Sequence, residues 1–243
     1  MRYKDGIILD ALMRIVGDGS DMMQDEIDED VRTTAAEALF NISCSSINET
    51  TDRFANHPNL LETCALVLKT HNVTREVKVY CAAIIKRMAE IIHFPKKCQL
   101  ELLSAMVKAS SWTRTACIAE AFLSQALVIE NRKGMVEHHG LLTALSKLAL
   151  VSGDGESDRV RSAAICAIEN LSREVGRVRE TLSKHEGIML AMTRASYGRR
   201  SGTSSTMDMS SMYRGGYQED ERSHSSENNR NMQLALKRLV EMI

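Results

Sequence analysis

One pattern of apolar residues recurs along this chain and restricts what it can fold into. Ala163–Ser172 reads AAICAIENLS and Thr34–Ser43 reads TAAEALFNIS, two small-residue segments with an asparagine at the same place. Both belong to a stripe in which apolar side chains follow the first one by 4, 7, 8 and 11 residues, which is one face of an α-helix. Full copies of the stripe begin at Val31, Val77, Val160 and Met232, and a weaker copy begins at Arg114.

The copies are spaced as in a helical-repeat protein. Their first residues lie 46, 37, 46 and 72 residues apart, and the longest interval contains a polar segment. Periods of roughly 40–47 residues, built of two or three helices, are typical of HEAT and armadillo solenoids. Aromatic residues make up only 4% of the chain and there are two prolines, which disfavours a β-sandwich. We therefore expect an all-α protein.

Shorter helical patterns fill the intervals between the stripe copies. One interval predicts a short helix over Arg132–His138, a corner at Gly140 and a second helix over Leu141–Leu150. Glycine supplies the backbone freedom that a sharp helix–helix corner needs. The same order recurs later as Val175–His185, Gly187 and Ile188–Ala195, and Tyr3–Val16 with Gly6 has the pattern of a lone second helix.

This three-helix unit resembles the armadillo repeat. The segment NRKGMVEHHGLLTALSKLA, from Asn131 to Ala149, is similar to that family's short helix, glycine and second helix. AAICAIENLS and TAAEALFNIS are similar to its third helix. The resemblance covers most of the chain outside the polar segment, and it implies a right-handed α-solenoid superhelix of armadillo-type repeats. It is weakest at Val77–Ser110, where Phe94–Pro95 replaces a glycine corner and HEAT-type packing stays open.

The sequence predicts three parts. Residues 1–196 form the armadillo-like repeat array, and residues 232–243 form the third helix of a last, incomplete repeat. Residues 197–231 form a disordered insert rich in Ser, Gly and Arg, because this segment contains no Leu, Ile, Val or Phe and cannot bury enough apolar surface to fold. The sequence starts on a second helix and stops on a third, so we expect part of a longer array with apolar surface exposed where a cap is missing.

The resemblance also implies a binding surface. In armadillo proteins the third helices line a concave groove, where an asparagine holds the backbone of an extended peptide. Asn41 and Asn170 match that asparagine, while Arg87 and Ser124 occupy its position in other copies. The alternative is that both asparagines only make structural hydrogen bonds at a helix end. The candidate groove residues are Glu37, Asn41, Arg87, Glu120, Ser124 and Asn170.

Two functions follow from this surface. The first is a non-enzymatic scaffold that binds partner proteins or extended peptides along the groove. The alternative is an importin-alpha-like transport adaptor that reads basic peptides, for which the acidic Glu37 and Glu120 are suited. That family places a tryptophan four residues before the asparagine, and this chain has Glu37, Ala83, Glu120 and Cys166 there, which disfavours the alternative.

Composition and motifs argue against several other classes. The formal net charge of -1 gives no global attraction for nucleic acid, and no apolar run reaches the roughly 18 residues of a membrane helix. The N-terminus does not resemble a signal peptide, and the six cysteines form no C-x-x-C pair. We therefore expect a cytoplasmic protein with reduced thiols, with the nucleus as a further location.

No known catalytic motif or cofactor-binding loop occurs, so we expect no enzyme activity and no cofactor. His138 and His139 are adjacent and lack companions at ligand spacing, so we expect no metal site. The acidic run Asp18–Asp30 has the composition of a solvated loop, with docking of a basic partner as the alternative. RRSGTSS resembles a basophilic kinase site, with Ser201 and Thr203 as candidate phosphorylation sites.

Overall fold

The structure, a computed structural model, describes residues 4–17, 28–45, 54, 57, 59–91, 96–153, 155–198 and 237. Every element within these ranges is an α-helix and none is a strand, which confirms the prediction of an all-α protein. The helices are α1 (Lys4–Gly17), α2 (Glu29–Ser43), α4 (Leu60–Lys69), α5 (Arg75–Ile91), α6 (Lys96–Trp112), α7 (Ala116–Leu127), α8 (Ile129–Glu137), α9 (Leu141–Ala149), α10 (Glu156–Ser172), α11 (Arg177–Lys184) and α12 (Glu186–Gly198).

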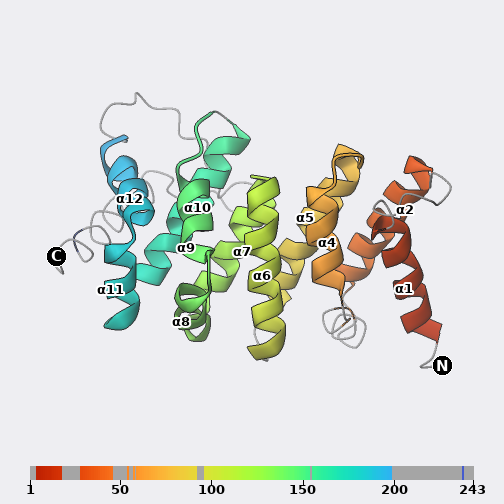
Figure 1. Ribbon diagram of the computed structural model, residues 1–243, viewed down its shortest axis with the longest axis horizontal. Helices are drawn as coiled ribbons and strands as arrows, with labels where there is room; N and C mark the ends of the chain where they lie inside the picture. Colours follow the sequence, from red (N-terminus) through yellow and green to blue (C-terminus); the bar gives the residue numbers. More distant parts are fainter. Residues whose placement is uncertain are drawn as a thin grey trace, which may run out of the picture.

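The helices form two rows that run side by side. The first row is α2, α5, α7 and α10, and the second row is α1, α4, α6, α9 and α12; in both rows each helix contacts the next. Figure 1 shows the helices succeeding one another along the long axis, from α1 and α2 at one end to α11 and α12 at the other. The short helices α8 and α11 contact each other and lead into α9 and α12.

The apolar stripe is the surface by which the first row packs. In α5 and α10 all five stripe positions are fully buried, from Val77 to Met88 and from Val160 to Leu171. A helix with neighbours on several sides buries the apolar side chains of this stripe. Their burial is the main source of stability for helices in a protein. The side chains predicted to lie in the core are all buried: Leu39, Ile85, Phe122, Ile168 and Leu171.

Helix α2 departs from the predicted stripe. Val31 is exposed, and Ala38 and Ile42 are only partly buried. The prediction that the whole stripe is buried is therefore wrong for this copy. Its physical reason is that α5 and α10 each contact an earlier first-row helix, whereas α2 has none before it within the described residues.

The unit between α5 and α7 differs from the others. Only residues 92–95 separate α5 from α6, and α6 is one helix of 17 residues, whereas α8 and α9 have 9 residues each. A single helix thus stands here in place of the short helix and the second helix. The weak stripe copy has the predicted phase, because Ile118, Phe122 and Gln125 are buried, although Arg114 lies before α7 begins.

The two predicted glycine corners have different outcomes. Gly140 directly precedes α9 with a φ of 79°, a left-handed conformation that favours glycine, so this corner is confirmed. Gly187 is the second residue of α12, and the chain turns instead at His185, whose φ and ψ are −87° and 103°. The predicted corner is therefore wrong by two residues. A Cβ at Gly187 would lie 2.7 Å from Ser146 Oγ on α9, so glycine is needed there for close helix packing.

Replacing Gly187 by alanine should lower the free energy of unfolding by about 1–3 kcal/mol, because the new methyl group overlaps Ser146. The matched control is Gly134→Ala in α8, where an added Cβ meets nothing within 4 Å. For Gly134→Ala, helix propensity alone predicts an increase of up to about 1 kcal/mol in the free energy of unfolding. Urea denaturation of both variants checks the prediction, and a stabilising effect of Gly187→Ala would contradict the close approach.

Parts of the predicted organisation lie outside the described residues. These are most of the acidic run, the candidate phosphorylation sites Ser201 and Thr203, and residues 232–243 apart from Lys237, which is helical and exposed. Helix α12 ends at Gly198, so the first two residues assigned to the insert, Tyr197 and Gly198, belong to a helix. Within the described ranges, no helix has the length and apolar character needed to span a membrane.

Candidate functional site

The first row carries every residue that the sequence marks as part of a groove. Glu37 and Asn41 lie on α2, Arg87 on α5, Glu120 and Ser124 on α7, and Asn170 on α10. Because each first-row helix contacts the next, equivalent positions of the stripe succeed one another along this row. Glu37 and Asn41 are exposed, Arg87, Glu120 and Ser124 are partly buried, and Asn170 is buried.

The two asparagines are in different environments. The Asn170 amide Nδ2 donates a hydrogen bond of 2.8 Å to the backbone oxygen of Cys166, one turn earlier on α10. This is the structural hydrogen bond that the alternative interpretation predicts for a helix end. Asn41 is exposed on α2, so its amide is accessible to a ligand.

The other two candidates at this position also bond to the protein. Arg87 Nε donates to the backbone oxygen of Ser43 over 3.3 Å, and its Nη1 lies 3.1 Å from Glu90 Oε2. Ser124 Oγ donates to the backbone oxygen of Glu120 over 3.0 Å. Arg87 thereby joins the end of α2 to α5, a contact that fixes neighbouring helices of the row.

A chain of ion pairs crosses three helices of the first row. Glu120 on α7 accepts from Lys86 Nζ of α5 over 2.7 Å and from Arg159 Nη2 of α10 over 3.0 Å, through different carboxylate oxygens. Charge-assisted bonds of this kind are stronger when they are partly withdrawn from water, and Lys86 and Glu120 both are. The single negative charge of Glu120 is therefore balanced by two cations of the protein itself.

Carboxylates at the beginning of one first-row helix also accept from the backbone at the beginning of another. Glu29 Oε1 accepts from the Thr74 N–H over 2.9 Å, and Glu156 Oε1 accepts from the Ala116 N–H over 3.4 Å. Burial works against ionisation of Glu29, but the bonds from Thr74 and the nearby Arg32 outweigh it and lower its pKa. The stability that ionised Glu29 contributes is fully present above the pKa that Glu29 has in the unfolded chain. It is lost as the pH falls through the lower pKa that Glu29 has in the folded protein.

A buried network of amide side chains joins the C-terminal ends of α5 and α7. Gln125 Nε2 donates to the backbone oxygen of Ala89 over 2.6 Å, and Asn131 Nδ2 of α8 donates to Gln125 Oε1 over 2.9 Å. Sequence reasoning missed this function of Gln125. A polar residue at a stripe position, followed by another amide six residues later, is the signal that could have revealed it.

An aromatic pair adds an apolar part to the first-row surface. The rings of Phe40 on α2 and Tyr80 on α5 have centroids 5.9 Å apart and are tilted by 41°, and both side chains are partly buried. Val79, next to Tyr80, is exposed. Aromatic groups of this kind offer apolar contact area at low cost in side-chain entropy. No pattern in the sequence singles out these three residues as part of a binding surface.

Two cysteine thiols, those of Cys81 and Cys117, have raised pKa values. The hydrogen bond with Cys64, followed by burial, raises the pKa of Cys81 well above its ordinary value. Burial, followed by the charge of Glu120, raises the pKa of Cys117, although Lys86 and Arg159 oppose this. A raised pKa keeps the thiol protonated, and the thiolate is the reactive form. These two cysteines therefore have the environment of packing residues.

The histidines before second-row helices join successive units. His138 Nε2 lies 3.1 Å from Ser104 Oγ, and His185 Nε2 lies 3.4 Å from Thr143 Oγ1. His57 Nε2 lies 3.2 Å from Asp10 Oδ1. Within the part of the chain that the structure describes, His, Cys, Asp and Glu side chains form no cluster of three or more that could hold a metal ion.

An open pocket of about 380 Å³ lies in the second row, between α1 and α4. Asp10 and Arg14 of α1 and Thr63 and Leu66 of α4 are among its lining residues. None of the six candidate residues lines it. The pocket and the predicted binding surface are therefore separate features.

The first row thus presents a surface of amide, ionic and aromatic side chains that is held together by contacts from helix to helix. Such a surface can offer hydrogen bonds and apolar contacts to a ligand that runs along several helices. Comparison of the chain with family models, with curated proteins and with solved structures finds no significant match.

Proposed function

We propose that this protein is an armadillo-type α-solenoid, a non-enzymatic scaffold whose first row of helices binds an extended segment of a partner protein. The observation that carries the proposal is the position of the six candidate residues on successive helices of one row. A cytoplasmic location, with access to the nucleus, suits such a scaffold. Neither a cofactor nor a nucleic acid is part of the proposal.

The spacing of the helices suits an extended chain. Packed helices are about 8–10 Å apart, and an extended chain advances about 3.3 Å per residue. One first-row helix therefore faces about every third residue of a bound segment. Exposed side chains such as Asn41 can donate to and accept from a peptide backbone that has no partner of its own.

The ion pairs argue against the basic-peptide alternative. A lysine or arginine of a ligand at Glu120 would compete with Lys86 and Arg159, which already occupy both carboxylate oxygens. Glu169 is paired with Arg173 and Glu90 with Arg87 in the same way. We therefore propose a partner segment that binds through its backbone and apolar side chains. Phe40 of α2 and Tyr80 and Val79 of α5 offer apolar contacts on the same row as Asn41.

Site-specific cross-linking tests the proposal. A photo-reactive amino acid replaces Glu37, which is exposed on the first row, or Lys147, which is exposed on α9 in the second row. In extract from the native organism, we expect a defined partner to be cross-linked from position 37 and not from position 147. Cross-linking from position 147 alone would place the binding surface on the second row and contradict the proposal.

The asparagines provide a second test, measured by titration calorimetry with the cross-linked partner segment. Asn41→Ala should weaken binding by about two- to tenfold, the value of one hydrogen bond of about 0.5–1.5 kcal/mol. Asn170→Ala should have a smaller effect, because its amide nitrogen already donates to Cys166. Circular dichroism verifies that both variants fold. Equal affinities of the Asn41→Ala variant and the unaltered protein would remove Asn41 from the binding surface.

A further inference from the structure

The pocket between α1 and α4 is bounded by two contacts between these parts of the second row. At one contact, Nε2 of His57, which precedes α4, lies 3.2 Å from Asp10 Oδ1 on α1. At the other, the helices approach so closely that a Cβ on Gly17 would lie 3.1 Å from Thr63 Cγ2. Asp10, Gly17 and Thr63 line the pocket, so both contacts fix its shape. Its volume of about 380 Å³ can hold part of a small ligand or about one to two residues of a peptide.

Three polar side chains that line this pocket have no partner within the described residues. Arg14 of α1 forms neither an ion pair nor a hydrogen bond, and the amide of Asn59, before α4, forms no hydrogen bond. The hydroxyl of Thr63 is unpaired as well, whereas Ser124 and Thr181 donate to a backbone oxygen of their own helix. Polar groups that converge on one pocket and lack partners in the protein are typical of a ligand site.

The backbone of Asn59 makes its amide informative. Among the non-glycine residues that the structure describes, Asn59 alone has a positive φ, of 67°. The equivalent residue before α9 is Gly140, with a φ of 79°. Glycine adopts this left-handed conformation without any side chain, and asparagine is one of the few other residues that tolerate it. Asn59 therefore satisfies the backbone of the corner and adds an amide that lines the pocket.

The lining of the pocket selects a ligand that has both a carboxylate and an N–H group. The free guanidinium of Arg14 suits a carboxylate, which it can bind through two parallel N–H bonds. Asp10, one turn earlier on α1, contacts His57 and not Arg14. Its negative charge disfavours a bare anion, but a carboxylate oxygen can accept from an N–H of the ligand. Met13 and Leu66 add apolar contacts.

A carboxylate, a neighbouring N–H group and an apolar side chain occur together in the last residue of a peptide. Small-molecule pockets enclose most of the ligand, whereas this pocket is open. The rest of a peptide chain can therefore leave it towards solvent.

We propose that the pocket between α1 and α4 binds the carboxyl-terminal residue of a peptide that ends in an apolar side chain. The terminal carboxylate contacts Arg14 and the amide of Asn59. The N–H of the same residue donates to Asp10, and its side chain packs on Met13 and Leu66. The pocket lies in the second row, so this proposal does not depend on the function proposed above for the first row.

Fluorescence anisotropy of the full chain with a labelled pentapeptide, Gly-Ser-Gly-Ala-Leu, tests the site. We expect a dissociation constant of about 10–500 µM, which suits a contact made by one residue. Amidation of the carboxyl end should weaken binding at least about tenfold, because it removes the charge that pairs with Arg14. Inorganic phosphate should not displace the peptide, because it brings a negative charge next to Asp10 and no N–H group.

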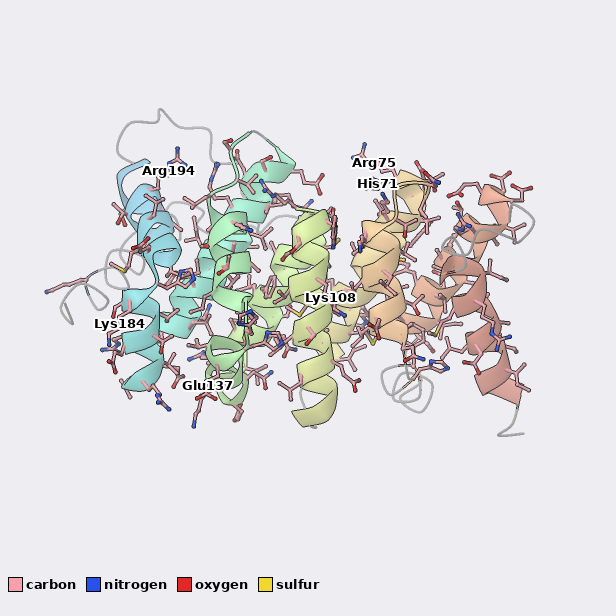
Figure 2. The ribbon with its side chains drawn as sticks, in the orientation of Figure 1. His71, Arg75, Lys108, Glu137, Lys184 and Arg194 are labelled. Atoms are coloured by element: carbon pink, nitrogen blue, oxygen red, sulfur yellow. The ribbon has the colours of Figure 1, made fainter. Side chains whose placement is uncertain are left out.

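Two variants separate the roles of the lining residues. Arg14→Gln should weaken binding by about ten- to a hundredfold, and Asn59→Gly by about two- to tenfold. Asn59→Gly introduces the residue that occupies the equivalent corner before α9, so the fold is kept and only the amide is lost. Arg194→Gln is the matched control, which removes the same charge from an exposed residue. Figure 2 shows Arg194 at the opposite end of the molecule from α1, and its replacement should leave binding unchanged.

Equal affinities of the peptide and its amide would overturn the proposal, and so would equal losses for Arg14→Gln and Arg194→Gln. No binding of the peptide up to about 1 mM would overturn it as well. Free leucine has the same carboxylate and side chain, with an ammonium group in place of the acylated nitrogen. If free leucine displaced the peptide at equal concentration, the choice of a peptide end would be wrong and the pocket would be a site for a free amino acid.

Discussion

Truncating Ile168 to alanine should lower the free energy of unfolding by about 2–5 kcal/mol, the usual range for a large aliphatic side chain in a core. Ile168 is completely buried in the middle of α10, the helix with contacts to α7, α9, α11 and α12. Because these neighbours are fixed from several sides, the cavity left by three missing carbons cannot close easily. Urea denaturation followed by circular dichroism measures the change.

The matched control for Ile168→Ala is Ile165→Ala. Ile165 lies one turn earlier on the same helix but is only partly buried, so its truncation should cost clearly less. The fluorescence of Trp112, which lies 5.3 Å from Lys69 Nζ, follows unfolding around α4 and α6 independently of the total helix content. Equal losses for Ile165→Ala and Ile168→Ala would contradict the burial pattern that defines the repeated stripe.

Replacing Arg132 by methionine should cost about 2–4 kcal/mol, because it removes several charge-assisted hydrogen bonds at once. Arg132 is buried on α8. Its Nε donates to the backbone oxygen of Ala126 over 2.8 Å, and its Nη1 bonds to Glu174 over 3.0 Å. It therefore caps the end of α7 and connects it to the turn after α10. Lysine at this position should recover little of the lost stability, because its single ammonium group cannot reproduce the arrangement of N–H donors on the planar guanidinium group.

Lys108→Met is the control for Arg132→Met. Lys108 and its partner Glu62 are both exposed, so this ion pair should contribute no more than about 0.5 kcal/mol. Both variants remove one positive charge, which separates the effect of net charge from that of the buried contacts. If Lys108→Met and Arg132→Met were equally stable, the capping of α7 by Arg132 would not be a structural constraint.

The periodicity of the sequence was sufficient to predict helix type and most buried positions. The stripes of α5 and α10 are buried at every predicted residue, because a helix enclosed on several sides needs all of them. Val31 fits the same pattern and is exposed. A pattern within one helix identifies the residues able to pack, but whether a neighbour is present is decided by the rest of the molecule.

Glycine was predicted less well because it meets two different physical needs. Gly140 adopts a left-handed conformation at a corner, whereas Gly187 lies within α12 and permits contact with Ser146. In the sequence, both needs appear as a glycine directly before an apolar run. Only the positions of the neighbouring helices distinguish them.

The candidate site could be predicted in part. The sequence located Glu37, Asn41 and Ser124 on equivalent segments, and the structure places these segments in one row. The ion pairs of Glu120 with Lys86 and Arg159 could not be predicted, because they join residues 34 and 39 positions apart that lie on different helices. Contacts of this kind depend on how neighbouring helices are rotated, and a single helical pattern contains no information about that rotation.

Hydrogen exchange of the protein, measured alone and with the partner segment proposed above, tests the central claim most directly. Amide protons exchange more slowly where a ligand stabilises the local structure. We predict that the partner slows exchange in α2, α5, α7 and α10, most strongly near Asn41 and Ser124. Slower exchange confined to the second-row helices α4, α6, α9 and α12 would contradict the assignment of the first row as the binding surface.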